Sequence, residues 1–194
     1  MLILFFAIQI CAFFQILCCI KAKKSKETIM TISVRKADFS EIFKIRDLAS
    51  VTIPTSYQNN LTTEQIDYLE DFLYAQQTLA DSEQSKQVFL IASLDGKDCA
   101  YGSFTQEGPD LFHLQKIFVN PDNQKKGLGS ALFKALLQEI SNEHPEPCDI
   151  ELNINHHNQG LKFYEKMGMK EVRIVNFDIG NGFIFTQKVL AIKN

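Results

Sequence analysis

A glycine-rich turn between a strand and a helix holds the residue types best suited to binding a ligand. The strand ends at Val119, and the chain then reads Gln124-Lys125-Lys126-Gly127-Leu128-Gly129-Ser130 before an amphipathic helix. Glycines let the backbone turn tightly and let a ligand approach with no Cβ in the way. The free N–H groups and the positive dipole end of a helix N-terminus favour an anion. The stretch is therefore typical of a site for a phosphate-bearing ligand.

Two common phosphate-binding motifs do not fit this turn. A Walker A loop requires a Lys-Ser/Thr pair directly after its last glycine, whereas Ser130 and Ala131 follow Gly129. A dinucleotide-binding G-x-G-x-x-G motif requires glycine where the chain has Leu132. The residues alone leave a second interpretation open, in which the glycines only relieve a strand-to-helix turn and bind nothing.

The histidines and cysteines do not form a metal-binding pattern. His156 and His157 are neighbours, and neighbouring side chains of extended backbone point in opposite directions. Cys99 and Cys148 are the cysteines that follow residue 30, and no CxxC or Cys/His spacing typical of zinc is present. We therefore expect no metal, and we expect reduced thiols.

Apolar periodicity and turn signals predict a mixed α/β domain in the order βααβββαβαββ. Three antiparallel strands followed by a β-α-β crossover imply a central mixed sheet with helices on its faces. Asp95-Gly96 is typical of a hairpin turn, Pro54 indicates a loop at residues 52–60, and Gly168 ends the last helix. The strands are expected at residues 31–36, 88–94, 97–106, 111–119, 149–154, 171–177 and 183–192, and the helices from about Asp38, Thr62, Gly127 and Asn158.

The composition changes near residue 30. Eighteen of the first twenty residues are apolar and none is charged, and residues 21–29 carry four lysines against one glutamate. The remainder has 16 basic and 22 acidic side chains, a net charge of −6 that argues against a nucleic-acid partner. Residues 1–29 are interpreted as a membrane anchor with a basic collar on the cytosolic side, or as a misassigned start before Met30. Residues 30–194 form the predicted domain.

Two separated motifs resemble those of the GNAT superfamily of N-acetyltransferases. Gln124-x-x-Gly127-x-Gly129 is similar to the acetyl-CoA signature Q/R-x-x-G-x-G/A, and Lys116-Ile117-Phe118-Val119-x-Pro121 resembles the strand before it. The second motif runs Leu152-x-Ile154-x-x-x-Asn158-x-Gly160-x-x-Phe163-Tyr164-x-x-x-Gly168-Met169. It departs from the family where Gly160 replaces a residue that is often Ala, and where Met169 replaces an aromatic residue. The resemblance covers about residues 30–194.

This resemblance implies that acetyl-CoA is the co-substrate and lies between a fourth and a fifth strand that are parallel but splay apart. The backbone of Ile117, Phe118 and Val119 would pair with the pantetheine arm as if it were an added strand. Asn158 would hydrogen-bond the cofactor, although asparagine also suits a helix N-cap. The pyrophosphate would be held, next to Gln124, by the N–H groups of Lys125, Lys126, Gly127, Leu128, Gly129 and Ser130.

The resemblance also implies direct attack by a neutral amine on the thioester. Tyr164 matches the family's tyrosine and is interpreted as the acid for the departing thiolate; a purely packing role is the alternative. Many relatives carry a basic Glu at or near the position of Gln115, which cannot accept a proton. His113 lies two residues earlier on the same strand face and has a suitable intrinsic pKa, so it is the candidate base, acting through water; a role that only caps the sheet edge is the alternative.

We therefore predict an acyl-CoA-dependent N-acetyltransferase that acetylates a primary amine of a small molecule, such as a polyamine or an amino-acid derivative. Alternatives are acetylation of a protein N-terminus or lysine, a CoA-binding module without catalysis, and a membrane-tethered interaction protein. The partners expected are the amine substrate, no nucleic acid, and a membrane only if residues 1–29 form an anchor. The oligomeric state is open, with a homodimer as one option. The expected location is cytoplasmic, or membrane-anchored with the domain facing the cytosol.

Overall fold

The computed structural model describes residues 30–58, 61–74, 87–156, 158, 160–178 and 182–194. Thr31–Asn194 form one compact unit. The expectations for residues 1–29 and for His157 lie outside the described residues. None of the helices in the described part of the chain combines the length and the apolar character that crossing a bilayer requires.

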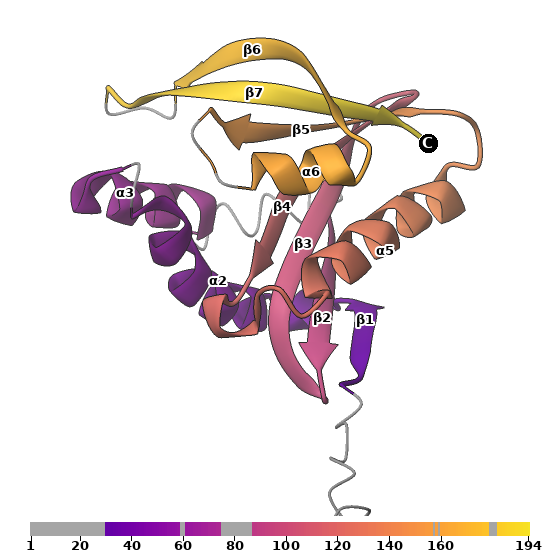
Figure 1. The fold of residues 1–194 in the computed structure, drawn as a ribbon, viewed down its shortest axis with the longest axis horizontal. Coiled ribbons are helices and arrows are strands. Elements are labelled where there is room, and N and C mark those ends of the chain that lie inside the picture. The colour runs from indigo at the N-terminus through magenta and orange to yellow at the C-terminus, as the bar shows by residue number, and fades with distance from the viewer. Residues whose placement is uncertain (1–29, 59–60, 75–86, 157, 159, 179–181) are drawn as a thin grey trace, which may run out of the picture. The chain divides into compact units, whose positions relative to one another are not determined.

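A seven-stranded mixed sheet forms the centre of this unit (Figure 1). The strand order is β1-β2-β3-β4-β5-β7-β6, in which β4 and β5 are parallel and all other neighbours are antiparallel. This arrangement confirms the predicted fold class and order of elements. The strands are β1 (Ile32–Lys36), β2 (Val88–Leu94), β3 (Lys97–Gly108), β4 (Leu111–Val119), β5 (Asp149–Asn155), β6 (Lys170–Asp178) and β7 (Ile184–Lys193).

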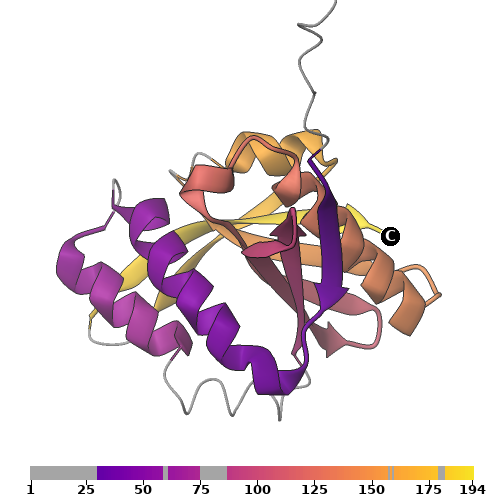
Figure 2. The same cartoon turned by 90° about the horizontal axis from the view of Figure 1, so that it is seen from below.

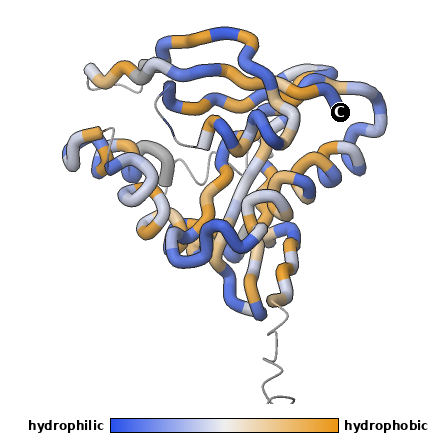
Figure 3. Tube along the Cα trace, in the orientation of Figure 1, coloured by the Kyte–Doolittle hydropathy of each residue, from blue (hydrophilic) through white to orange (hydrophobic). Residues whose placement is uncertain are grey.

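Helices cover both faces of the sheet (Figures 1 and 2). α2 (Ile42–Tyr57) and α3 (Thr63–Tyr74) lie on one face, and α5 (Leu128–Glu143) and α6 (Leu161–Lys166) lie on the other. Single 3-10 turns, η1 (Phe39–Glu41) and η2 (Pro121–Asn123), precede α2 and α5. Apolar and polar residues alternate along α5 and β7, as expected for elements with one buried side (Figure 3).

Two hydrophobic cores result, one on each face. The α5 core includes the buried Leu132, Phe133 and Leu136 of α5 together with alternate residues of β4 and β5. The α2 core includes Ile45 and Ile53 of α2 with residues from α3, β2 and β3. The sheet separates the two cores, and the neighbouring strands β2, β3 and β4 contribute side chains to both.

Local sequence signals mark the ends of several helices and strands as predicted. Thr62 and Gln65 form a complete capping box, since the Thr62 N–H donates to Gln65 Oε1 at 3.0 Å and the Gln65 N–H donates to Thr62 Oγ1 at 3.3 Å. Asp95 and Gly96 both have positive φ, at 51° and 80°, as a type I′ hairpin turn requires. Gly168, at φ 96°, follows the end of α6.

The expectation of a loop at residues 52–60 is wrong, because α2 continues through Pro54 to Tyr57. Burial outweighs the cost of proline here, since Ile53 is fully buried and Thr52 is 1% exposed. The hydroxyl of Ser56 donates to the Thr52 carbonyl at 2.6 Å, which supplements the hydrogen bonding of the last turn. Tertiary packing therefore carries the helix past a residue that would end it in isolation.

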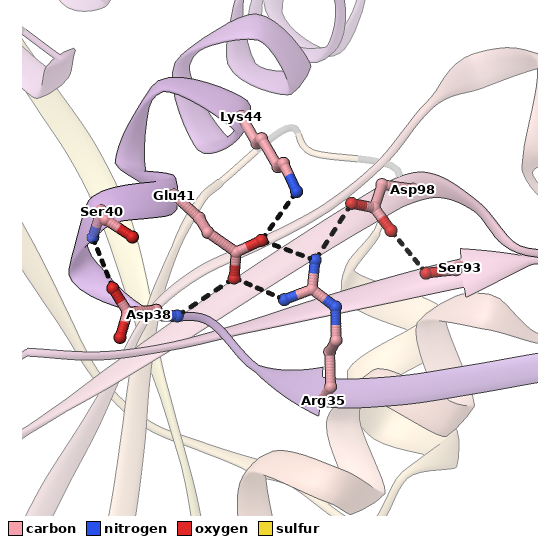
Figure 4. A network of polar contacts seen from close by, with 7 residues as sticks. All are labelled: Arg35, Asp38, Ser40, Glu41, Lys44, Ser93 and Asp98. Carbon is pink, nitrogen blue, oxygen red and sulfur yellow. Dashed lines mark hydrogen bonds and ion pairs between the residues drawn. The ribbon is translucent and has the colours of Figure 1, made fainter.

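A charge network fixes the start of α2 to the edge of the sheet (Figure 4). Arg35 of β1 donates to both carboxylate oxygens of Glu41, at 2.7 and 3.1 Å, and also to Asp98 of β3 at 3.2 Å. Lys44 reaches Glu41 at 2.7 Å. Hydrogen bonds from Lys44 and Arg35 lower the pKa of Glu41 from 4.5 to about 2. The carboxylate therefore stays ionised far into the acid range.

We predict that this network contributes to stability above pH 4.5 and that the contribution disappears as the pH falls through about 2, because a carboxyl with a lowered pKa stabilises the fold only while it is ionised. Thermal unfolding of the wild type and of Glu41→Gln, followed by circular dichroism from pH 7 to pH 2, should show a Tm difference that closes over this window. Arg35→Gln should show the same loss. A Tm difference that does not change with pH would contradict this assignment.

Candidate active site

The central parallel strands β4 and β5 stay paired over only three positions. Their register ends where His113 lies beside Glu151. β4 continues to Val119 and β5 to Asn155, and the described residues show no further pairing between the two strands. Beyond His113, the facing backbone edges of β4 and β5 are therefore not hydrogen-bonded to each other. Such an edge can hydrogen-bond an extended ligand.

A β-bulge at Gln115 accompanies this separation. Ser103 of β3 pairs with Lys116, whereas the following residue, Phe104, pairs with Leu114, so Gln115 is the extra residue. The bulge also shifts the alternation of side chains. Leu114 and Ile117, three residues apart, both pack against the α5 core. A bulge bends and twists its strand, which helps β4 to diverge from β5.

The end of β4 lies between the two cores. Ile117 and Val119 pack on the α5 core, while Phe118 stacks on Tyr101 of the α2 core with ring centroids 5.5 Å apart. On one edge this segment is paired with β3, where Ile117 lies beside Gly102. Its other edge faces the diverging β5. The predicted pantetheine-pairing residues therefore lie on the open edge of β4.

The glycine-rich turn leads from this edge into α5. Lys125 and Gly127 adopt the left-handed region, at φ 61° and 92°. Gly127 is the N-cap of α5 and supplies no side-chain hydrogen bond to the first turn. The Gln124 side chain donates to the Val119 carbonyl at 3.4 Å, and Lys126 Nζ donates to the Asp122 carbonyl at 2.8 Å. The first-turn N–H groups of α5 are thus without a side-chain cap, as an anion-binding helix start requires.

Gly129 is not required by the protein's own packing. A Cβ at this position would lie 3.6 Å from the Phe163 ring and 3.8 Å from Val119, which are ordinary contacts. Gly127 differs, because its positive φ itself favours glycine. The same distances show that the turn, the end of β4 and α6 meet at Gly129. The absence of a side chain there keeps backbone accessible, which supports the ligand interpretation of this turn.

Asn158 shapes the turn before α6. Its Oδ1 accepts a hydrogen bond from the Gly160 N–H at 2.7 Å, so this oxygen is engaged within the protein. A Cβ on Gly160 would lie 2.9 Å from the same oxygen, which explains glycine at the position of the family's small residue. The Asn158 carboxamide NH2 is the group that could donate to a cofactor. Met169, the other departure, is 2% exposed in the α5 core and fills an apolar position.

Tyr164 lies on α6 among aromatic side chains. Its ring centroid is 5.1 Å from that of Phe163 and 6.3 Å from that of Phe133, so it does pack the helix against α5. Burial raises the pKa of Tyr164 well above its usual 10, and Tyr57 acts in the same direction. Tyr57 ends α2 on the other face of the sheet, and burial raises its pKa as well.

His113 belongs to a polar cluster on the face opposite to the α5 core. Its side chain is 12% exposed, and its Nδ1 lies 3.5 Å from Glu107 Oε2. Gln115 Nε2 donates to Glu107 Oε1 at 3.1 Å. Burial lowers the pKa of His113 below its usual 6.5, whereas Glu107 and Glu151 oppose this shift. Glu107 is part of β3 rather than of the following turn, where the sequence pattern placed it.

Two charged features of this region were not found from the sequence. Arg173 of β6 reaches across β7 and donates to both oxygens of Glu151, at 2.7 and 2.5 Å. Lys116, directly after the bulge, lies with its Nζ 5.9 Å from the Phe89 ring centroid, and burial lowers its pKa to about 8. The Glu151–Arg173 pair depends on the order β5-β7-β6, for which the sequence carries no local signal.

A splayed parallel pair, a helix start without a side-chain cap and a buried phenol together form a candidate site for an extended, phosphate-bearing ligand. A family model described as an acetyltransferase (GNAT) domain matches residues 57–187, more than half of the chain. The chain therefore belongs to the GNAT acetyltransferase family, and the resemblance identified from its motifs is confirmed.

Individual relatives are distant. The ribosomal protein bS18 alanine N-acetyltransferase of Escherichia coli strain K12 is 27% identical over 103 residues, which are 53% of this chain and 68% of that protein. Among solved structures, the PaiA N-acetyltransferase of Thermoplasma acidophilum in complex with coenzyme A has a TM-score of 0.66 at 19% identity, covering 81% of this chain and 98% of that one. The structure of the E. coli ribosomal-protein alanine N-acetyltransferase has a TM-score of 0.62 at 17% identity, covering 84% and 94%. These structural similarities support the fold.

Proposed function

We propose that residues 30–194 form an acetyl-CoA-dependent N-acetyltransferase that transfers the acetyl group directly to a primary amine. The observation that carries this proposal is the meeting of three features at Gly129: the open edge of β4, the helix start of α5, and α6 with Tyr164. Family membership supplies the reaction class. The cofactor bound in structures such as that of the T. acidophilum relative is coenzyme A.

In this proposal the chain's own groups hold the cofactor along β4 and α5. Backbone groups of Ile117, Phe118 and Val119 pair with the pantetheine arm, and the N–H groups of residues 125–130 bind the pyrophosphate. Gln124 and the Asn158 carboxamide NH2 border this path. The thioester carbonyl then lies in the region that Tyr164 approaches from α6.

The chemical step requires one proton to leave the amine and one to reach the sulfur. The amine nitrogen attacks the thioester carbon, the C–S bond breaks, and the amide forms. The raised pKa keeps Tyr164 protonated at neutral pH, so the phenol can donate to the sulfur as negative charge develops. His113, neutral at the same pH because burial lowers its pKa, accepts the proton that the amine loses.

The first acceptor that we propose is a small cationic amine. Glu107 supports it, because its carboxylate is partly exposed beside His113. The second candidate is the N-terminus of a protein, which is the activity named for the E. coli relative. A lysine-like amine costs about 4.6 kcal/mol to deprotonate at pH 7, whereas an α-amine costs only about 1 kcal/mol. An imidazole base is better matched to the α-amine.

A panel of acceptors tests the proposed function. Thiol release from acetyl-CoA by the full chain should be measured with spermidine, lysine, amino-acid amides and short peptides with a free N-terminus. Turnover with any of these supports an acetyltransferase, and the preferred class separates the two candidates. Binding of acetyl-CoA without turnover would favour a CoA-binding module. We place the activity in the cytosol, where the free and buried Cys99 and Cys148 stay reduced.

We predict that Gly129→Val weakens coenzyme A binding at least roughly tenfold, because a branched side chain in the first turn of α5 covers the backbone that the ligand approaches. Calorimetric titration measures the affinity, and thermal unfolding shows that the variant is folded. Gly129→Ala is the matched control, because the signature accepts alanine at this position and its methyl group meets only ordinary contacts in the protein. The affinity of this control should stay close to that of the wild type. Unchanged affinity in Gly129→Val would refute the role given to this turn.

We predict that Tyr164→Phe lowers kcat by roughly 10- to 100-fold, because it removes the donor for the departing thiolate. The ring contacts with Phe133 and Phe163 are kept, so Tm and the KM for acetyl-CoA should change little. The readout is thiol release over the full pH range. If the rate of this variant equals that of the wild type at every pH, Tyr164 only packs the helix.

A further inference from the structure

The polar cluster around His113 contains two carboxylates, Glu151 and Glu107. The position of Glu107 is explained by neither folding nor cofactor binding. Glu107 lies near the end of β3, and β4 returns beside it, so that His113 and Gln115 both face its side chain. One carboxylate oxygen lies 3.5 Å from His113 Nδ1, and the other accepts the 3.1 Å hydrogen bond from Gln115. Each oxygen thus has its own partner.

We propose that Glu107 is a positioning residue that holds His113 in the tautomer with the proton on Nδ1, and that Gln115 holds Glu107 in place. This inference rests on the proposed role of His113 as the base. A carboxylate beside Nδ1 can only accept a hydrogen bond, so it selects the form that carries its proton there. The lone pair is then on Nε2, which becomes the atom that accepts a proton from the amine.

The proposal accounts for glutamine at position 115. Gln115 donates from its NH2 group to Glu107 Oε1, which a glutamate at the same position could not do while ionised. Two carboxylates at that separation would repel each other, and one would take up a proton. Gln115 cannot itself accept a proton, but it is suited to orient the Glu107 carboxylate that supports the base His113.

The neighbouring charges leave Glu107 as the carboxylate available to the imidazole. Glu151, next to His113 across the parallel pairing, is held by both arms of Arg173. Glu107 and Glu151 favour the charged form of His113, whereas burial and Arg173 disfavour it. Because Arg173 offsets the charge of Glu151, the balance at the imidazole depends mainly on Glu107.

The proton balance of the step is simple. As the amine nitrogen forms its bond to the thioester carbon and the C–S bond breaks, the amine proton passes to His113 Nε2 and gives an imidazolium, while Tyr164 gives its proton to the sulfur. Glu107 stays ionised and stabilises that charge through the Nδ1–H hydrogen bond. The imidazolium then returns its proton to water, and water restores the proton of Tyr164. Glu107 itself touches neither the amine nor acetyl-CoA in this scheme.

Nitrogen NMR of the ligand-free full chain tests the tautomer without any need for turnover. Long-range proton–nitrogen correlation spectra at pH 8 should show His113 protonated on Nδ1, with the signal assigned through its loss in His113→Gln. In Glu107→Gln the amide oxygen is held by Gln115, so the amide NH2 faces Nδ1 and should move the proton to Nε2. Wild-type His113 protonated on Nε2, or a tautomer that does not change in Glu107→Gln, would overturn the proposal.

The same variants have a kinetic signature that a merely structural role would not give. We predict that Glu107→Gln lowers kcat at least roughly tenfold, with the KM for acetyl-CoA within about twofold of the wild type. Loss of the carboxylate lowers the pKa of His113, so the acid limb of the kcat/KM profile should move to lower pH. A lower rate with an unmoved pH profile would contradict positioning.

Asp110→Asn is the matched control. Asp110 lies in the turn between β3 and β4, and its Oδ1 is 3.3 Å from Nε2 of a different histidine, His144. The tautomer of His113 and the pH profile should be unchanged in this variant. If no amine is acetylated by the wild type, the proposed function fails, while the NMR result still decides whether Glu107 sets the tautomer.

Discussion

The short pairing between β4 and β5 is the constraint on which the rest of the site depends. Only the first three positions of the parallel pair are joined, and the bulge at Gln115 follows directly. The end of β4 keeps one edge bonded to β3 and one edge open. The glycine-rich turn begins where that open edge ends, so the direction of β4 fixes where the start of α5 lies. A fully paired sheet of the same strands would have no open edge to offer a ligand.

The two faces of the sheet give the two proton-transfer candidates opposite surroundings. Tyr164 lies among Phe133 and Phe163, and burial raises its pKa. His113 is also buried, but carboxylates offset part of the cost of its charged form. Burial thus pushes both groups toward neutrality, which leaves one as a donor and the other as an acceptor of protons near pH 7.

The sequence predicted those parts of the fold that depend on local chemistry. Thr62 with Gln65 and Asp95 with Gly96 were readable because a capping box and a hairpin turn are formed by neighbouring residues. Pro54 misled the prediction, because the burial of Ile53 that carries α2 past it is a tertiary effect. The helix start was readable from its glycines in the same local way.

The parts of the site that were missed depend on contacts across strands. A bulge is defined by what lies opposite in β3, so the extra residue at Gln115 is not visible in β4 alone. The Glu151–Arg173 pair requires β7 to lie between β5 and β6, and Glu107 meets His113 only after the β3–β4 turn closes. Motif spacing predicts which residues bind the cofactor, whereas it does not predict which charges surround the candidate base.

The division of the hydrophobic interior into two cores has a consequence for how such a protein can diversify. The glycine turn, α6 and Tyr164 are built on the α5 core, whereas Tyr57 and the end of α2 are built on the other. Side chains on opposite faces of a sheet share few contacts, so substitutions in the two layers, the interacting Tyr57 and Tyr164 apart, should combine almost additively. Drift in the α2 layer can therefore proceed while the glycine-rich turn and α6 on the α5 layer are inherited unchanged.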